Sequence, residues 1–268
     1  MNKVYAWQEA PTADFAVIGF PIKHSLSPKM HSAAFAALEL EASYVAIEVH
    51  PGEVSQALDA LRTKGYRGVN VTVPHKEDAF QWCEETSSVA SHLGVCNTLN
   101  LAERKGTNTD VIGFANSLAI EDRADKRAMV LGAGGSARAI LYALISEGWQ
   151  VTLWNRTRSR ADDMVKSLGF PIGISDRPVL TDMDLIVNTT SASLTGDRLP
   201  LDWSTAPQNA LAYDLAYGPT LTPFLADAAS FGLETMDGRR MLMEQGAAAF
   251  EYWWSREAPR EQMMEALL

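Results

Sequence analysis

Apolar segments alternate with amphipathic ones over the first hundred residues of the chain. The apolar segments are short and rich in Val, Ile, Phe and Tyr, and the segments between them repeat apolar residues at helical spacing. Strands that alternate with helices are typical of α/β folds built from βαβ units. The pattern predicts strands at 15–19, 44–49 and 69–73, and helices at 28–40, 52–63 and 76–84.

A second alternation follows the polar segment 121–127, which we interpret as a linker. Before this segment, the pattern predicts a short hairpin at 97–101 and 106–109 and a helix at 111–120. After it, the pattern predicts strands at 128–131, 150–154, 184–188 and 210–215, and helices at 135–147 and 159–168. The tail from residue 238 is helical in pattern and could pack on either α/β unit.

The composition favours two packed domains that bind a small molecule. A chain of 268 residues is near the size at which one hydrophobic core divides into two domains. The hydrophobic fraction is 47%, and no apolar run approaches the roughly 20 residues of a membrane-spanning helix. The 23 basic and 33 acidic residues give a formal charge of −10, which disfavours nucleic acid or an anionic membrane as a partner.

The N-terminus and the cysteines indicate where the protein works. Residues 1–11 lack the apolar segment of a secretory signal. Cys83 and Cys96 have the spacing of neither a metal site nor a redox motif. We therefore expect a cytoplasmic protein with reduced thiols.

A glycine-rich turn follows the predicted strand 128–131. Residues 132–137 fit the pattern G-x-G-x-x-A, in which glycines permit a tight turn and the next helix offers free N–H groups to a pyrophosphate. By itself the motif is weak, because methyltransferases and non-enzymatic Rossmann-like domains have similar turns. The turn predicts a dinucleotide site only together with its context.

The end of the predicted strand 150–154 supplies that context. An NAD site usually has an acidic residue there, which binds the ribose 2′-hydroxyl. This chain has Asn155 instead, and Arg156, Arg158 and Arg160 follow. A guanidinium group suits a 2′-phosphate, so the preferred cofactor is NADP(H). The alternative is a helix start with solvated arginines, which the helix dipole disfavours.

A lysine stands just beyond the predicted strand 69–73. Three valines alternate with Asn70 and Thr72 in this strand, which predicts one buried face and one polar face. Pro74 ends the strand, and Lys76 falls in the first turn of the next helix, where a cation opposes the dipole. The position therefore indicates a chemical role for Lys76, although Asn70 and Thr72 could also be solvated positions.

Other polar residues can be explained as caps and turns. Ser27 and Pro28 fit the N-cap and N1 positions of a helix, whose start could also bind a carboxylate with the hydroxyls of Ser25 and Ser27. Asp110 is a good N-cap for the helix 111–120. The hydroxyl, amide and carboxylate groups are those that a polyhydroxylated ligand needs.

Several motifs of the chain, and the order in which they occur, resemble those of the shikimate dehydrogenase family. The resemblance covers about residues 15–254, and its most specific segments are 70–76 and 97–98. The motifs are Ser25-Leu26-Ser27-Pro28, Asn70-Val71-Thr72-Val73-Pro74-His75-Lys76, Gly94-Val95-Cys96-Asn97-Thr98, Asn108-Thr109-Asp110, the turn 132–138, Asn155-Arg156-Thr157 and Met241-Leu242-Met243-Glu244-Gln245.

The resemblance implies a substrate-binding domain at 1–112, completed by helices at 238–268, and a Rossmann-like NADP-binding domain at 113–237. It implies that Lys76 and Asp110 are the catalytic pair. The substrate residues that it implies are Ser25, Ser27, Asn70, Thr72, Lys76, Asn97, Asp110, Tyr217 and Gln245. The cofactor residues that it implies are Gly132, Ala133, Gly134, Gly135, Ser136, Ala137, Asn155, Arg156, Thr157, Arg158, Arg160, Asn188, Thr189, Leu215 and Gly238.

The implied activity is the NADP-dependent reduction of 3-dehydroshikimate to shikimate in aromatic amino acid biosynthesis. Lys76 would transfer the proton while a hydride moves to or from the nicotinamide, and no metal is expected. The protonation state of Lys76 stays open, and a monomer or homodimer is expected. The alternatives are a quinate/shikimate dehydrogenase of broader specificity and a ligand-binding paralogue without catalysis.

Overall fold

The computed structural model describes residues 3–118 and 126–268, and the chain forms two compact units. Unit 1 consists of Met1–Gly113 and Leu242–Leu268, and unit 2 consists of Phe114–Met241. The boundaries fall inside two helices, α5 (Asp110–Ser117) and α10 (Arg239–Trp254). No helix within the described residues combines the length and the apolar character that crossing a membrane requires.

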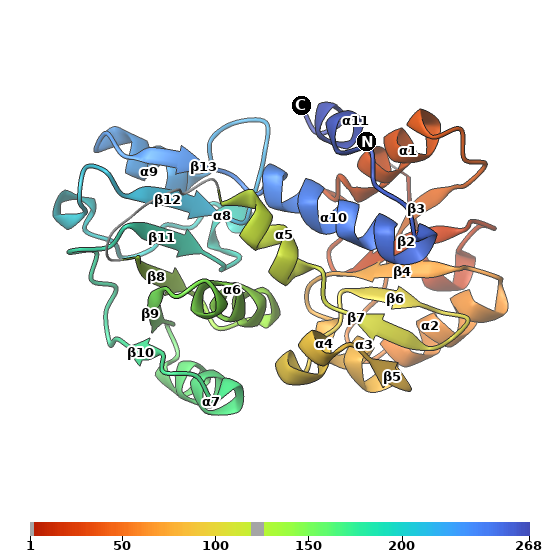
Figure 1. Cartoon of the computed structure of the whole chain (residues 1–268), viewed down its shortest axis with the longest axis horizontal. Coiled ribbons are helices and arrows are strands. Elements are labelled where there is room, and N and C mark those ends of the chain that lie inside the picture. The colour runs from red at the N-terminus through yellow and green to blue at the C-terminus, as the bar shows by residue number, and fades with distance from the viewer. Residues whose placement is uncertain (1–2, 119–125) are drawn as a thin grey trace. The chain divides into compact units, whose positions relative to one another are not determined.

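Unit 1 is built on a seven-stranded mixed sheet in the order β1-β3-β2-β4-β6-β7-β5 (Figure 1). The strands from β1 to β4 run parallel, and β6 and β7 are the antiparallel hairpin that the sequence predicted. The strands are β1 (Val4–Ala6), β2 (Phe15–Gly19), β3 (Tyr44–Glu48), β4 (Gly68–Val71), β5 (Glu85–Thr86), β6 (Thr98–Asn100) and β7 (Lys105–Thr107).

Helices cover both faces of this sheet, and each face has its own core. Successive strand residues alternate between the cores, so that Val17 packs on one side and Ile18 on the other. Ile18 shares its core with α2 and α3, and Val17 shares its core with α1, α10 and α11 (Figure 1). The helices are η1 (Trp7–Glu9), α1 (Ser27–Ala37), α2 (Val54–Thr63), α3 (Lys76–Trp82), α4 (Ser88–Leu93) and α11 (Arg260–Glu265).

Unit 2 contains a six-stranded sheet, all parallel, in the order β10-β9-β8-β11-β12-β13. In chain order within the unit this is 3-2-1-4-5-6, the strand order of dinucleotide-binding Rossmann domains. The strands are β8 (Arg127–Leu131), β9 (Gln150–Trp154), β10 (Gly173–Ile174), β11 (Leu185–Asn188), β12 (Leu211–Asp214) and β13 (Glu234–Met236). The helices are α6 (Gly135–Ser146), α7 (Arg158–Leu168), α8 (Ala192–Thr195), η2 (Trp203–Thr205) and α9 (Pro223–Ser230). The predicted α/β fold class is thus confirmed.

Four local predictions need correction. Asp110 was predicted as the N-cap of the helix 111–120, but it is the first residue of α5 itself. The strand predicted at 69–73 ends at Val71, after which Thr72 N–H donates to Ile18 O at 2.9 Å and the chain turns. Asn70 was expected on a polar face, but it is buried, because α1 and α10 cover that side of the sheet. Helix α1 begins at Ser27 itself, and its N-cap is Leu26, whose side chain cannot accept a hydrogen bond. The predicted linker 121–127 lies mostly outside the described residues.

Candidate functional site

Lys76 is the first residue of α3, as its sequence position predicted, and it is 7% exposed. The strand β4 delivers the chain to this point, and a turn at 73–74 separates strand from helix. Two acidic residues in the same first turn, Glu77 and Asp78, complement the helix dipole that the lysine opposes. The lysine is therefore buried at a helix start whose dipole it opposes.

Asp110 is the partner of Lys76. Lys76 Nζ donates to Asp110 Oδ2 at 2.5 Å, and both side chains are less than a tenth exposed. Asp110 is the first residue of α5, and its own N–H donates to Asn108 Oδ1 at 3.1 Å. Removing either partner of such a pair would leave the other charge buried without a counter-charge, which is strongly destabilising.

Asn97 connects this pair to the rest of unit 1. Its Nδ2 donates to Asp110 Oδ1 at 2.8 Å and to Thr109 Oγ1 at 3.0 Å, and it lies 3.4 Å from Gln245 Oε1. Its Oδ1 accepts the backbone N–H of Thr109 at 2.7 Å. Asn97 thus brings α5, α10 and the start of β6 to one point.

The approach of Gln245 depends on a glycine. A Cβ atom on Gly113 of α5 would lie 2.6 Å from the Cβ of Gln245 and 2.7 Å from its backbone nitrogen. Only a residue without a side chain lets the two helix segments come this close. The Nε2 of Gln245 donates to Leu242 O at 2.8 Å, which fixes the amide orientation.

Asn70 is held by groups that the sequence did not single out. Tyr44 OH donates to Asn70 Oδ1 at 2.7 Å, while Asn70 Nδ2 donates to Asn97 O at 3.2 Å and to Thr98 Oγ1 at 3.0 Å. Both amide hydrogens of Asn70 are therefore used within the protein. Tyr44 has the sequence character of a core strand residue, and no local signal marks its hydroxyl as part of the site.

The remaining predicted substrate residues lie in three different places. Ser25 and Ser27 lie at the start of α1, where Ser25 Oγ accepts the Ser27 N–H at 3.3 Å. Thr72 follows β4 and is half-buried. Tyr217 belongs to unit 2, in the loop after β12, so the contacts within unit 1 do not bring it to the Lys76 cluster.

In unit 2 the glycine turn has the backbone geometry that the sequence predicted. Gly132 has φ +108°, and a Cβ there would meet Thr189 Oγ1 at 2.7 Å and Thr190 Cγ2 at 2.8 Å. Gly134 is the N-cap of α6, and the turn is pinned by the Ala133 N–H, which donates to Asn155 Oδ1 at 3.2 Å. The start of α6 therefore presents backbone N–H groups that suit a pyrophosphate.

The three arginines after β9 are not equivalent. Arg158 pairs with Asp162 at 3.0 Å and also contacts Asp176. Arg156 and Arg160 are exposed, and within the described part of the chain neither forms an ion pair. These two guanidinium groups fit a 2′-phosphate better than Arg158 does.

A buried carboxylate, which the sequence patterns did not single out, lies at the carboxyl end of β12. Asp214 is fully buried and accepts hydrogen bonds from Ser193 Oγ at 2.5 Å, Thr222 Oγ1 at 2.6 Å and Asn188 Nδ2 at 3.1 Å. Burial raises the pKa of the Asp214 carboxyl, and the hydrogen bonds oppose that shift. Asn188 is itself buried, and it bonds to Ser193 and to the Thr190 N–H, so it holds the segment after β11 in place. The sequence signal that could have identified Asp214 is an acidic residue at the end of an apolar strand.

Leu215 and Gly238 meet next to this carboxylate. A Cβ on Gly238 would lie 2.0 Å from Leu215 O, so the position excludes any side chain. Thr189 Oγ1 donates to Leu131 O at 2.8 Å, which ties β11 to the strand that carries the glycine turn. The predicted cofactor residues of unit 2 thus follow the carboxyl ends of β8, β9, β11, β12 and β13.

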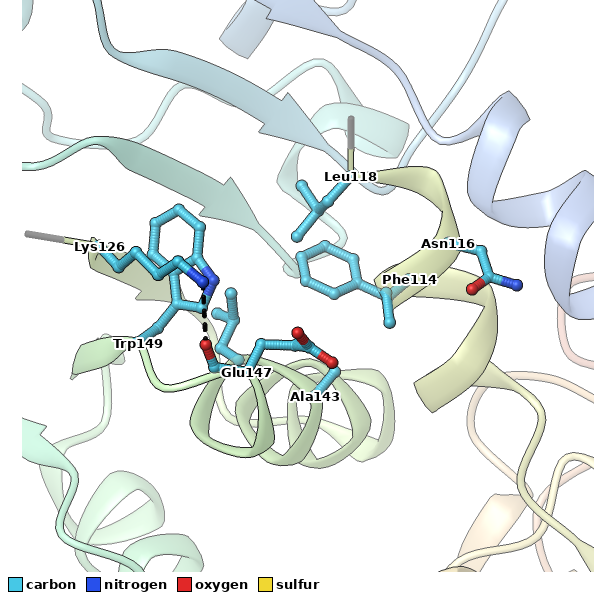
Figure 2. Close-up of a pocket in the computed structure, with 9 residues that line it drawn as sticks. Phe114, Asn116, Leu118, Lys126, Ala143, Glu147 and Trp149 are labelled. Carbon is cyan, nitrogen blue, oxygen red and sulfur yellow. Dashed lines mark hydrogen bonds between the residues drawn. The ribbon is translucent and has the colours of Figure 1, made fainter. Parts of the chain in front are cut away.

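Figure 2 shows a pocket in unit 2 that is not this site. It has a volume of about 170 Å³ and is lined by Phe114, Lys126, Glu147 and Trp149 among others. Lys126 precedes β8, so the pocket lies at the amino end of the strand, whereas ligands of open α/β sheets bind at the carboxyl ends.

Comparisons with known proteins agree with these features. Residues 17–99 match the shikimate dehydrogenase substrate binding domain, residues 115–198 match the shikimate / quinate 5-dehydrogenase model, and residues 238–268 match the shikimate 5'-dehydrogenase C-terminal domain. A shikimate dehydrogenase (NADP(+)) of Moorella thermoacetica is 42% identical over 270 residues, which cover 94% of this chain and 91% of the relative.

Solved structures extend the similarity to the whole fold. The shikimate dehydrogenase of Aquifex aeolicus has a TM-score of 0.89 and 35% identity, and the match covers 97% of this chain and 98% of that one. The shikimate 5-dehydrogenase of Thermus thermophilus, in complex with NADP(H) and shikimate, has a TM-score of 0.84 and 37% identity over 94% of this chain and 97% of that one.

The sheet order and the glycine turn place unit 2 in the class of Rossmann-type nucleotide-binding domains. With the matches above, the chain belongs to the shikimate dehydrogenase family. The family resemblance inferred from the sequence motifs is thereby confirmed.

Proposed function

We propose that the protein catalyses the reversible, NADP-linked reduction of 3-dehydroshikimate to shikimate. The observation that carries this proposal is the buried pair of Lys76 and Asp110, joined to Asn97, in a chain whose relatives are NADP-dependent shikimate dehydrogenases. We assign substrate binding to unit 1 and cofactor binding to unit 2. A cytoplasmic location and a monomeric or homodimeric state stay predictions from the sequence.

In this proposal Lys76 exchanges the proton of the reacting oxygen. Lys76 Nζ donates that proton in carbonyl reduction and accepts it in alcohol oxidation. Asp110 fixes the direction of the ammonium group, and Asn97 fixes Asp110 through its 2.8 Å hydrogen bond. Because the pair is buried, few water molecules compete for the transferred proton.

The other polar groups of unit 1 would orient the substrate. The hydroxyls of Ser25 and Ser27 suit the carboxylate, and Thr72 and Gln245 suit ring hydroxyls. Asn97 is better assigned to positioning, because Thr109 Oγ1 and Asp110 Oδ1 take both of its amide hydrogens. Asn70 is better assigned to positioning, because Asn97 O and Thr98 Oγ1 take both of its amide hydrogens.

The groups of unit 2 fit NADP. The backbone of 132–137 would hold the pyrophosphate, and Arg156 and Arg160 would hold the 2′-phosphate. The chemistry that NADP supplies when bound is hydride exchange with the substrate carbon. Tyr217 from the loop after β12 stays a proposed substrate contact.

Replacement of the lysine tests the proposal most directly. We expect Lys76→Ala to lower the turnover of shikimate with NADP by about 100-fold or more, because general acid–base catalysis contributes about 10²–10⁴-fold. Steady-state absorbance of the reduced nicotinamide measures turnover, and fluorescence titration should show unchanged NADP affinity. Lys64→Ala is the matched control, because Lys64 Nζ donates only to Ala10 O, at 2.7 Å, among the contacts described for it. Full activity of Lys76→Ala would contradict the assignment.

Substrate and cofactor specificity need a second assay. The wild-type protein is given shikimate or quinate, each with NADP or NAD. We expect the highest kcat/KM for shikimate with NADP. No turnover with any pair would indicate a ligand-binding paralogue, and faster turnover of quinate with NAD would overturn both specificity assignments.

A further inference from the structure

The two cysteines of unit 1 meet in the fold, although their spacing in the sequence shows no motif. Cys83 is the C-cap of α3, and Cys96 lies just before β6. A Cβ atom placed on Gly106 of β7 would lie 2.6 Å from the sulfur of each cysteine. The two sulfurs are therefore neighbours, and the absence of a side chain at residue 106 makes the space for both.

The two thiols have different surroundings. Cys96 is fully buried, whereas Cys83 is partly exposed and its thiol donates to Ala79 O at 3.2 Å. A hydrogen bond from Cys96 lowers the pKa of the Cys83 thiol, burial opposes this, and the charge of Arg104 lowers it further. The hydrogen bond to Cys83 and burial raise the pKa of Cys96. Cys83 is therefore the nucleophile of the two, and Cys96 is the thiol that reacts second.

Arg104 is fixed beside Cys83 by several contacts. Its guanidinium lies over the Trp82 ring, 4.6 Å from the centroid, and donates to Trp82 O at 2.8 Å. It also pairs with Glu84 at 3.2 Å. A guanidinium held in this way stabilises a thiolate on the adjacent residue.

We propose that Cys83 and Cys96 form a peroxide-sensitive dithiol that closes to an intramolecular disulfide. In the first step, the Cys83 thiolate attacks hydrogen peroxide, so that an S–O bond forms, the O–O bond breaks and hydroxide leaves and takes up a proton. In the second step, the Cys96 sulfur attacks the Cys83 sulfur of the sulfenic acid. The S–S bond forms, the S–O bond breaks, and the departing hydroxide takes the Cys96 proton as water. Two thiols lose two electrons, and one peroxide becomes two water molecules.

The disulfide would act on the proton-transfer site through α3. Cys83 ends the helix that Lys76 begins, and the Cys96 N–H donates to Lys76 O at 3.0 Å. Cys96 also precedes Asn97, which holds Asp110. A disulfide requires a sulfur–sulfur distance of about 2 Å. Its formation therefore draws the C-terminal end of α3, at Cys83, toward the segment that holds Cys96 and Asn97. We expect oxidation to lower turnover severalfold and a dithiol reductant to restore it.

The test treats the full-length protein with hydrogen peroxide and measures its intact mass after the remaining thiols are blocked. We expect the loss of two hydrogens with no blocked thiol, and a linked peptide pair that contains Cys83 and Cys96. Two free thiols, intermolecular dimers or only sulfinic acid would overturn the proposal.

Three variants define the roles of the two cysteines. Cys83→Ser, at the partly exposed position, should react with peroxide neither at residue 83 nor at Cys96. Cys96→Ser should accumulate a sulfenic acid on Cys83 that a cyclic dione traps. Arg104→Gln should slow disulfide formation severalfold. If peroxide modified Cys96 in Cys83→Ser, the proposed order of the two steps would be wrong.

The same oxidised samples give the effect on turnover. Shikimate oxidation should fall in the wild type and stay constant in Cys83→Ser. This readout rests on the proposed function, whereas the mass measurement does not. A complete disulfide with unchanged turnover would overturn the coupling to α3 alone.

Discussion

Unit 1 and unit 2 hold their proposed functional groups in opposite ways. In unit 1, Lys76, Asn97 and Asp110 are buried side chains that bond to one another. In unit 2, the groups that suit a nucleotide are the backbone of the turn 132–137 and the exposed guanidinium groups of Arg156 and Arg160. Unit 2 also has buried polar side chains, but these hold neighbouring segments of the backbone in place. Asp214 does so through its bonds to Asn188, Ser193 and Thr222.

The difference follows from the chemistry that each unit would perform. Proton transfer needs fixed distances between side-chain atoms and little competing water. Phosphate binding needs several N–H donors that converge, which a turn and a helix start supply without any particular side chain. Side-chain changes should therefore damage unit 1 most, and changes that affect the backbone should damage unit 2 most.

Within this comparison of the two units, the largest effect is expected for Asp110→Asn. The amide cannot balance the buried Lys76 ammonium, so we expect turnover to fall about 100-fold. The free energy of unfolding should fall by about 3 kcal/mol, because the charge of Lys76 stays buried without its partner. Steady-state kinetics and urea denaturation measure the two effects.

An exposed ion pair of the same unit provides the control. Glu85→Gln removes the pair with Lys105 at 3.3 Å, where Glu85 is 68% exposed. The free energy of unfolding should change by less than about 1 kcal/mol, since exposed pairs contribute little. If both variants lost equal stability, burial of the Lys76 pair would not be the reason for its importance.

Gly132→Ala tests the backbone side of the comparison. The new Cβ would clash with Thr189 and Thr190 at a residue with φ +108°, so we expect the Kd for NADP to rise by more than about 10-fold. Shikimate binding to unit 1 should be unchanged. Calorimetric titration measures both ligands.

Gly148→Ala is the matched control for this prediction. Gly148 also has a positive φ, +79°, but a Cβ there has open space around it. The variant should lose about 1 kcal/mol of stability from backbone strain and keep its affinity for NADP. Equal loss of NADP affinity in both variants would mean that strain, rather than the shape of the turn, controls binding.

Much of this arrangement could be predicted from local sequence patterns, because a strand, a turn or a helix start depends on nearby residues. The hairpin of β6 and β7, the glycine turn and the place of Lys76 in the first turn of α3 are examples. The bond from Tyr44 to Asn70 could not be predicted, because it depends on which side of the sheet both strands present. The same holds for Asp214, whose partners are Ser193 in α8 and Thr222 at the N-cap of α9.

The two units also differ in how their buried titratable side chains make stability depend on pH. His31 is fully buried and stacks on Tyr44 with ring centroids 4.4 Å apart, and burial lowers the His31 pKa from 6.5 to about 3. Below pH 6.5 the unfolded chain thus binds a proton that folded unit 1 does not bind, and stability falls as the pH falls toward 3. Asp214 has the opposite sign, because its raised pKa lets folded unit 2 bind a proton at a higher pH than the unfolded chain does.

The lowered pKa of His31 therefore predicts an acid sensitivity of unit 1. From pH 7 to pH 5, His31 should lower the free energy of unfolding of unit 1 by about 2 kcal/mol, since one pKa unit corresponds to about 1.4 kcal/mol. Hydrogen exchange at both pH values, read separately for the amides of β2 to β4 and of β8 to β12, measures this change in each unit. His31→Gln should reduce the pH dependence of unit 1 and leave that of unit 2 unchanged, and the remainder in unit 1 is expected from His75, whose pKa burial also lowers. If His31→Gln keeps the full acid sensitivity, another group of unit 1 binds the proton on unfolding.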